Sequence, residues 1–465
     1  MYLRVLCLLV LTSLLILLGQ PNAQANGVGN GTSAESAVQQ MAAESGEVLP
    51  PQIQPEVTSP APVFPDYLQR SQIISTYEQE VHQSPNSFLL LRLLAAEYLK
   101  RFREVGDVED LLRAEQATRS SLAIQPSHNV GASMLLASAL LSQHQFLEAL
   151  QVVTGVQQTV PGNSNIASLM ASIQMELGDY EAAHQLLQSL TTESANSGHN
   201  AVAARYLELT GNLAAARQLL DQTMQQMDAF YTISAETRAW FHVRAGDLAF
   251  AAGDFDLSEQ RYREALELFP MDVPAFTGLT RLYVTQHRWQ EALKAADWGI
   301  ELVPLVETLG YKVDAQRALG DPEGAAATED LIGVVARLSK VKGIYDRALA
   351  VYYTEHGIHL PEALEIAQRE VAVRDDIYAE DTLAWAAAAN GHWQEAQQAV
   401  QRATRYGTED ALLQFHAGMI ALHGGKQEEA IKRLTQAVSL NPHFHPKYAD
   451  EAHQVLAKLT QSASS

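Results

Sequence analysis

The sequence predicts an all-α solenoid of about ten helix pairs, closed at its C-terminal end by one further helix. Three observations lead to this fold class. From Tyr67 onward there is almost no strand signal. Segments rich in Ala, Leu, Gln and Glu, with apolar residues at helical spacing, alternate with short breaks such as ELGDYE and ANGHW. These breaks recur at a similar interval along the chain, which indicates internal repetition.

One spacing defines the repeated unit. A small residue in the second helix of a pair lies twelve residues before a proline at five places. A small residue lets two helices cross closely, and a proline ends the second helix. Successive prolines are 34 or 35 residues apart where two such units adjoin. The five instances are Ala114 and Pro126, Ala149 and Pro161, Ser258 and Pro270, Ala292 and Pro304, and Ala430 and Pro442.

This unit resembles the tetratricopeptide repeat (TPR), and the resemblance covers nearly all of the chain beyond residue 65. The family implies a right-handed superhelix whose first helices line a concave groove for extended peptides or partner helices. Two segments depart from the pattern and are candidate changes of curvature: 223–240, which is long for a turn, and 331–353, which drifts in register. Five further units lack the proline and place Ala183, Ala216, Ala325, Ala363 and Ala396 at the crossing.

The N-terminal residues predict export. Arg4 precedes an apolar run, Val5–Leu18, and Ala23 and Ala25 follow at the spacing that a signal peptidase recognises. We predict a cleaved signal peptide and a periplasmic or extracellular protein; an uncleaved membrane anchor is the alternative. The resulting segments are a signal peptide at 1–25, a disordered Pro/Ser/Gly/Ala-rich tether at 26–65, a partial helical unit at 66–85, the TPR solenoid at 86–442, and a capping helix and tail at 443–465.

Composition excludes several classes of partner. The formal net charge is −22, which argues against nucleic acid and against anionic membrane surfaces, because both require a basic face. The single cysteine, Cys7, lies within the predicted signal peptide, so the mature chain has no disulfide to hold it together.

Catalytic signatures are absent from the sequence. It contains no G-x-S-x-G elbow, no H-E-x-x-H motif, no phosphate-binding glycine loop and no dinucleotide fingerprint. The repeats leave no segment for a separate catalytic domain. We therefore predict a protein that is not an enzyme and has no cofactor.

The family rule for first helices places three sets of residues in the groove. The C-terminal set is aromatic, as binding anchors often are, although these rings could instead be buried between helix pairs. This partner-binding set is Tyr345, Tyr352, Tyr378, Trp385, Phe415 and Met419. The middle of the groove receives Arg205, Glu208, Asp247, Arg281 and Arg317. Its N-terminal end receives Met134, Ser138, Ser168, Ser172 and Met175, which lack the paired Lys and Asn of a carboxylate clamp.

Histidines and acids offer two weaker candidates for a metal site. The motif NPHFHP brings His443 and His445 near His453 and His416, but no cysteine or dense carboxylate set completes a ligand shell. His356 and His359 fall in a turn that we expect to be solvated. Asp254 and Asp256 in AAGDFD lack the glycine and distant glutamate of a calcium loop. We predict no metal site.

The function predicted from the sequence is a non-catalytic, exported scaffold that binds a protein or peptide in its concave groove. The alternatives are a metal-binding or enzymatic accessory protein of the cell envelope, or a membrane-anchored assembly factor. The sequence leaves the partner and the oligomeric state open.

Overall fold

The computed structural model describes residues 66–189, 196–227, 233–341 and 347–463. The predicted signal peptide and tether lie outside these residues. Within them, the regular structure consists of α-helices and one 3₁₀ segment, η2, and contains no strand. The all-α prediction is therefore confirmed.

Twenty of the helices form ten consecutive pairs, in which each first helix packs against the second helix that follows it. The first helices are α3 (Phe88–Val105), α5 (Val130–Ser142), α7 (Ser164–Glu176), α9 (Ser197–Leu209), α11 (Ala235–Ala251), α13 (Val273–Thr285), α15 (Val306–Ala318), α17 (Arg347–His356), α19 (Ile377–Ala389) and α21 (Ala411–His423). The second helices are α4 (Val108–Ile124), α6 (Phe146–Thr159), α8 (Tyr180–Gln188), α10 (Leu213–Met227), α12 (Phe255–Leu268), α14 (Trp289–Leu302), α16 (Pro322–Val341), α18 (Leu360–Val371), α20 (Trp393–Ala403) and α22 (Gln427–Leu440).

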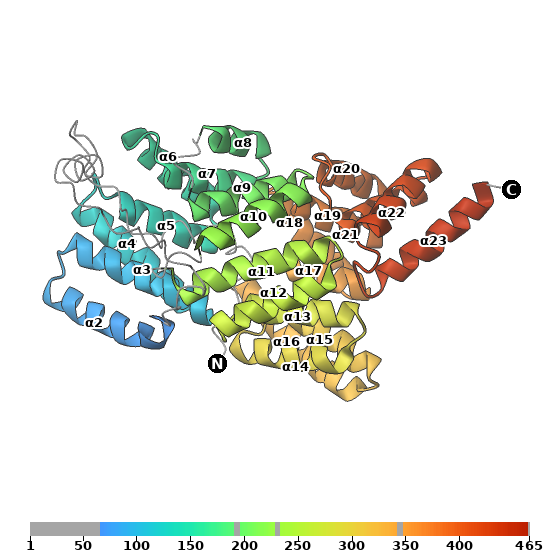
Figure 1. The fold of residues 1–465 in the computed structure, drawn as a ribbon, viewed down its shortest axis with the longest axis horizontal. Coiled ribbons are helices and arrows are strands. Elements are labelled where there is room, and N and C mark those ends of the chain that lie inside the picture. The colour runs from blue at the N-terminus through green and yellow to red at the C-terminus, as the bar shows by residue number, and fades with distance from the viewer. Residues whose placement is uncertain (1–65, 190–195, 228–232, 342–346, 464–465) are drawn as a thin grey trace, which may run out of the picture.

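The two ends of the solenoid carry additional helices. At the N-terminal end, η2 (Asp66–Gln69) and α2 (Arg70–Gln83) precede the first pair. At the C-terminal end, α23 (Tyr448–Ala463) packs on α21 and α22. Tyr448, Ala449 and Ala452 are buried there, and the remainder of α23 extends away from the body (Figure 1). This is the position predicted for a capping helix.

The crossing of each pair depends on a small residue, as the sequence predicts. Ser258 in α12 is fully buried, and its hydroxyl donates a hydrogen bond to the carbonyl oxygen of Gly246 in α11 at 2.9 Å. The equivalent alanines are at most 2% exposed: Ala114, Ala149, Ala183, Ala216, Ala292, Ala325, Ala363, Ala396 and Ala430. A larger side chain at these positions would force the two helices apart.

The pairs form two layers around a curved path. The first helices of most successive pairs contact one another, for example α11 with α13 and α13 with α15. The first helices therefore make up the inner layer and the second helices the outer layer. Two segments, 223–240 and 331–353, were predicted to depart from the repeat pattern. Each contains the start of the next first helix, α11 and α17 respectively.

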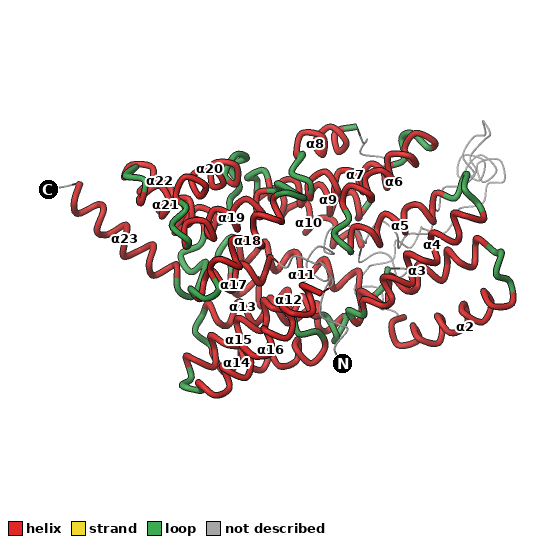
Figure 2. Tube along the Cα trace, turned by 180° about the vertical axis from the view of Figure 1, so that it is seen from behind, coloured by secondary structure: helices red, strands yellow, loops and turns green. Residues whose placement is uncertain are grey.

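The path returns on itself, so that the last pairs lie beside the middle ones (Figures 1 and 2). Loops that precede α19, α21 and α23 contact the ends of α7, α9 and α11. We call these contacts the seam. They join the third pair to the ninth, the fourth to the tenth, and the fifth to the capping helix, a constant offset of six units.

Three hydrogen bonds mark the three levels of the seam. Arg374 Nη1 donates to Glu176 Oε2 at 3.0 Å. Thr408 Oγ1 donates to the carbonyl oxygen of Leu209 at 2.6 Å. Asn441 Nδ2 donates to the carbonyl oxygen of Phe250 at 2.8 Å. The partners are 198, 199 and 191 residues apart in sequence.

The crossing can be tested within one helix, α16. Ala325 is 2% exposed at the crossing, whereas Ala327 lies on the exposed face. Ala325→Leu should lower the free energy of unfolding in urea by about 1–3 kcal/mol, because the added methylenes have no space. Ala327→Leu should change it by less than about 0.5 kcal/mol. Equal effects of the two substitutions would contradict the packing described here.

Candidate functional site

A chain of ion pairs runs along the inner layer from α9 to α13. Glu208 accepts hydrogen bonds from Arg205 at 2.8 Å and from Arg244 at 2.7 Å. Arg244 also pairs with Asp247 at 2.9 Å, and Asp247 accepts from Arg281 at 3.0 Å. The five side chains keep between 12% and 28% of their surface exposed. They thus remain partly accessible while each charge has a partner.

The two arginines beside Glu208 favour its ionised form. Burial would raise the pKa of Glu208, but the charges of Arg205 and Arg244 outweigh it and hold that pKa below its usual value. Tyr262 donates to Asp247 at 2.7 Å. The guanidinium of Arg281 lies over the ring of Phe250 at 4.3 Å. The inner face between α9 and α13 therefore presents fixed, alternating charges.

Three histidine–carboxylate pairs lie toward the C-terminal end. Each histidine contacts a carboxylate from another structural element: two pairs join successive first helices, and the third joins the loop before α23 to α17. The pairs are His356 Nε2 with Asp314 Oδ1 at 2.9 Å, His416 Nδ1 with Asp381 Oδ2 at 3.0 Å, and His445 Nε2 with Glu355 Oε1 at 3.4 Å.

The pair at His356 has a shifted protonation equilibrium. Burial disfavours the charged imidazolium, but the hydrogen bond to Asp314 and the charge of that carboxylate outweigh it. The pKa of His356 is therefore above its usual value. The pKa of Glu355 is lowered: burial opposes ionisation, and the nearby histidines, led by His445, overcome that effect.

Aromatic rings form a packed cluster beside these histidines. Trp385 stacks on His416, with ring centroids 4.3 Å apart, and its Nε1 donates to the hydroxyl of Tyr448 at 3.3 Å. Phe415 stacks on Tyr448 at 4.9 Å. The cluster joins the last pair to the capping helix.

The residues of the aromatic set predicted to bind a partner differ in how far they are buried. Phe415 is fully buried and Tyr352 is 5% exposed, so these two rings pack between helix pairs instead of lining an accessible surface. Tyr352 lies against His356, with ring centroids 4.2 Å apart. Tyr378, Trp385 and Met419 are half-buried and come from the inner helices α19 and α21. Tyr345 lies outside the described residues.

The other two predicted sets have different outcomes. Four of the five middle residues come together in the ion-pair chain, and Arg317 instead pairs with Glu329 near the end of α15. The N-terminal set is buried, so it offers no accessible groove surface: Met134, Ser138, Ser168, Ser172 and Met175. Arg244 is not among the predicted residues, although its position three residues before Asp247 on one helix indicates an ion pair.

The candidate metal residues are engaged elsewhere. His416 and His445 pair with single carboxylates. In the turn expected to be solvated, Gly357, Ile358 and His359 are exposed, whereas His356, at the end of α17, is only 11% exposed. Asp254 pairs with Arg217 at 3.0 Å. Throughout the part of the chain that the structure describes, no three His, Cys, Asp or Glu side chains gather as a metal site would require.

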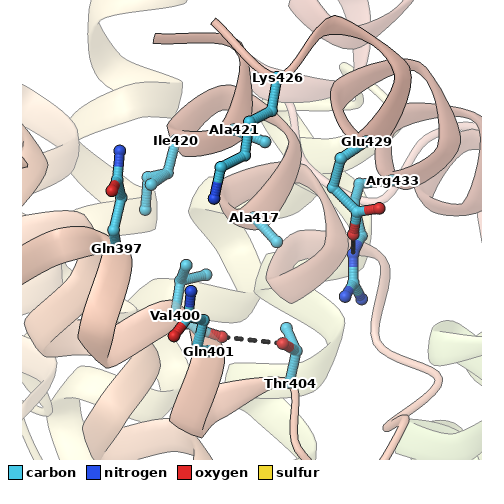
Figure 3. A pocket seen from close by; sticks show the side chains of 10 residues that line it. All are labelled: Gln397, Val400, Gln401, Thr404, Ala417, Ile420, Ala421, Lys426, Glu429 and Arg433. Atoms are coloured by element: carbon cyan, nitrogen blue, oxygen red, sulfur yellow. Dashed lines mark hydrogen bonds and ion pairs between the residues drawn. The ribbon is translucent and has the colours of Figure 1, made fainter. Parts of the chain in front are cut away.

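One pocket lies between the second helices of the last two pairs, with α21 as its floor (Figure 3). Its volume is about 340 Å³. The floor is apolar, and the rim carries amides and charges, with Arg433 paired to Glu429. Its lining residues are Gln397, Val400, Gln401, Thr404, Ala417, Ile420, Ala421, Lys426, Glu429 and Arg433. Across residues 66–463, apart from the gaps given above, no helix has the length and apolarity of a membrane span.

Family models of the tetratricopeptide repeat match residues 140–205, 243–297 and 382–443. The chain contains tetratricopeptide repeats. Repeats of this family generally mediate protein–protein interaction and typically belong to non-catalytic scaffolds. No curated protein sequence matches this TPR protein.

Solved structures with a similar fold have low sequence identity to this TPR protein. PilW, a type IV pilus biogenesis factor, is 19% identical, covering 48% of this chain and 97% of its own, with a TM-score of 0.38. A tetratricopeptide repeat protein from Parabacteroides merdae is 18% identical, covering 56% and 98%, with a TM-score of 0.38. The Cut9–Hcn1 complex gives 12% identity, coverage of 84% and 93%, and a TM-score of 0.31. At these scores the likenesses support no inference about function.

The pair of Asp314 and His356 gives a pH-dependent prediction. Because the pKa of His356 is raised in the folded state, the pair stabilises the fold at pH below about 6.5, the usual histidine value, and this stabilisation is lost as pH rises through the folded pKa. Asp314→Asn should therefore reduce stability more at about pH 5.5 than at about pH 8.5. Asp314 is 34% exposed, so solvent screening should keep the difference below about 1 kcal/mol.

The control for this prediction is the same substitution in a His356→Gln background. There, Asp314→Asn should have one effect at both pH values, as measured by urea unfolding. A pH-dependent difference that persists without His356 would assign the titration to another group.

Proposed function

We propose that this TPR protein is an exported, non-catalytic scaffold that binds a protein or peptide partner on the inner face of its solenoid. The ion-pair chain from Arg205 to Arg281 is the observation that carries the proposal. It places both signs of charge, partly exposed, on three successive inner helices. A solenoid presents such a surface as a continuous strip, which suits an extended partner segment.

The chemistry of the inner face defines the partner that it would accept. Arginine guanidinium groups offer planar sets of N–H donors, and the carboxylates offer acceptors in between. A partner must replace water on these groups with its own polar atoms, because an unpaired charge in a partly enclosed site is costly. The net charge of −22 favours encounter with basic or neutral proteins.

One half-buried ring, that of Tyr378, adjoins the ion-pair chain and would add apolar contact. Tyr378 in α19 lies under the guanidinium of Arg205 at 5.4 Å, so the two sets adjoin across the inner face. Trp385 and Met419 lie on the inner helices α19 and α21. Aromatic side chains next to arginine are typical of residues that dominate binding energy.

Export is the second component of the proposal. It rests on the N-terminal sequence, in which the apolar run Val5–Leu18 is followed by Ala23 and Ala25. Cleavage after Ala25 would release a chain without cysteine into the periplasm or the extracellular space.

Site-specific photo-crosslinking tests the inner face. A photoreactive phenylalanine replaces Tyr378 on the inner layer or, as the matched control, Trp298, which is 63% exposed on the outer helix α14. In cells that produce the protein natively, the variant at Tyr378 should give discrete crosslinked products, because this position adjoins the charged strip. The variant at Trp298 should give at most about a tenth of that yield. Equal products at both positions, or products from Trp298 alone, would overturn binding on the inner face.

N-terminal sequencing of the protein isolated from its native source tests export. We expect the mature chain to begin at Asn26. A chain that retains Val5–Leu18 and fractionates with membranes would instead support the anchored alternative.

A further inference from the structure

The seam differs in kind from the contacts that hold the helix pairs together. The apolar clusters mostly join helices that are neighbours along the solenoid; for example, one cluster joins residues of α5, α6 and α7. The seam instead joins loops to helix ends. Apolar contact across the seam is concentrated near its first two levels, where Ile377 packs with Tyr180 and Leu209 and the ring of Tyr406 lies 4.6 Å from that of Tyr180. The pairs can therefore keep their cores when the seam is broken.

Side chains of the later loops satisfy backbone groups at the ends of earlier inner helices. The last carbonyl groups of a helix have no partner within it. Leu209 is the final residue of α9, and its carbonyl accepts from Thr408. Phe250 lies in the last turn of α11, and its carbonyl accepts from Asn441. Water can replace either donor when the seam separates.

Arg374 pairs with one carboxylate across the first level of the seam and with another on its own side. The guanidinium pairs with Glu176 across the seam and with Asp376 on its own side at 2.7 Å. Burial would lower the pKa of Arg374, but the neighbouring carboxylates outweigh it and raise that pKa. Separation would hydrate Glu176 and leave Arg374 paired with Asp376. Opening therefore leaves no buried charge unpaired. An unpaired buried charge is the usual reason why breaking such a pair costs much free energy.

Two turn glycines show how closely the two sides approach. A Cβ atom on Gly178 would lie 2.2 Å from Asp375 Oδ1 and 2.7 Å from the carbonyl oxygen of Asp375. A Cβ atom on Gly211 would lie 2.4 Å from the carbonyl oxygen of Gly407. The equivalent turn at Gly391 has nothing within 4 Å, at nearly the same backbone angle: φ is +76° at Gly391 and +82° at Gly178. An alanine at either position would therefore have a similar backbone strain, but only the alanine at 178 would clash with the other side of the seam.

We propose that the seam opens and closes as one cooperative unit while the helix pairs stay folded. Its polar contacts each contribute only about 0.5–1.5 kcal/mol net, whereas each pair is held by an apolar core. Segments with few apolar contacts open at lower free energy than the whole fold. On each side of the seam, the three levels lie on consecutive helix pairs that are packed against one another. When one level separates, the pairs that carry it therefore move the next level as well.

Opening of the seam controls the width of the inner face. Arg205 in the fourth pair lies over Tyr378 in the ninth, and this contact spans the inner face next to the seam. In the closed state the strip accommodates a side chain or an extended segment; in the open state it admits a folded surface. This consequence for partners rests on the proposed function, whereas the opening itself does not.

Thiol labelling tests the opening without any partner. In a Cys7→Ser background the chain has no other cysteine, so one reporter can be introduced at a time. Thr408→Cys places a thiol at the second level of the seam, where Thr408 is 1% exposed; it removes the hydrogen bond to Leu209 in every variant compared, so the measurement is the change in rate that a first-level substitution adds. Ser258→Cys places one at a helix crossing, where Ser258 is fully buried. The seam is weakened at its first level by Gly178→Ala, and Gly391→Ala is the matched control.

We expect Gly178→Ala to raise the labelling rate of Thr408→Cys about tenfold or more, with Ser258→Cys unchanged. Gly391→Ala should change neither rate. Glu176→Gln, which removes the ionic contact without a steric clash, should act in the same direction and serves if Gly178→Ala does not fold. The proposal is overturned if Thr408→Cys is insensitive to both first-level substitutions, or if both reporters accelerate together. Because the assay uses a small thiol reagent alone, its failure would leave the crosslinking result on partner binding intact.

Discussion

Close helix crossing at one small residue per pair is the constraint on which the rest of the structure depends. With Ser258 or its equivalents buried at the crossing, the two helices of each pair approach closely and present one face to the next pair. Repetition of that geometry creates an inner layer of first helices, and only this layer brings side chains from successive units together. The ion-pair chain and the histidine–carboxylate pairs at His356 and His416 arise because successive inner helices lie side by side.

The fold was predictable from the sequence because its determinants are local. The offset from Ala292 to Pro304, and its recurrences, identify both helices of a unit and their crossing without any long-range information. The inner-face residues were harder to predict, because a shift of one residue on a helix turns a side chain by about 100°. Arg205 and Asp247 were placed on the inner face, whereas Phe415 and Tyr352 turned out to pack between pairs.

The seam and the histidine pairs could not have been predicted from the sequence alone. Arg374 and Glu176 are 198 residues apart, and no local pattern marks either as the partner of the other. His356 likewise lies in what reads as an ordinary turn, and its partner, Asp314, is 42 residues earlier. The seam contacts depend on the cumulative curvature of six units, which small differences in each crossing angle determine.

The constant offset of the seam restricts how this chain can change in length. A solenoid whose units contact only their neighbours can gain or lose a repeat with little effect elsewhere. Here, a repeat inserted between α12 and α19 would bring the wrong loop beside Gly178, and the donors for the carbonyls of Leu209 and Phe250 would be displaced by a full unit. The seam contacts thus require a fixed number of repeats in this segment of the chain.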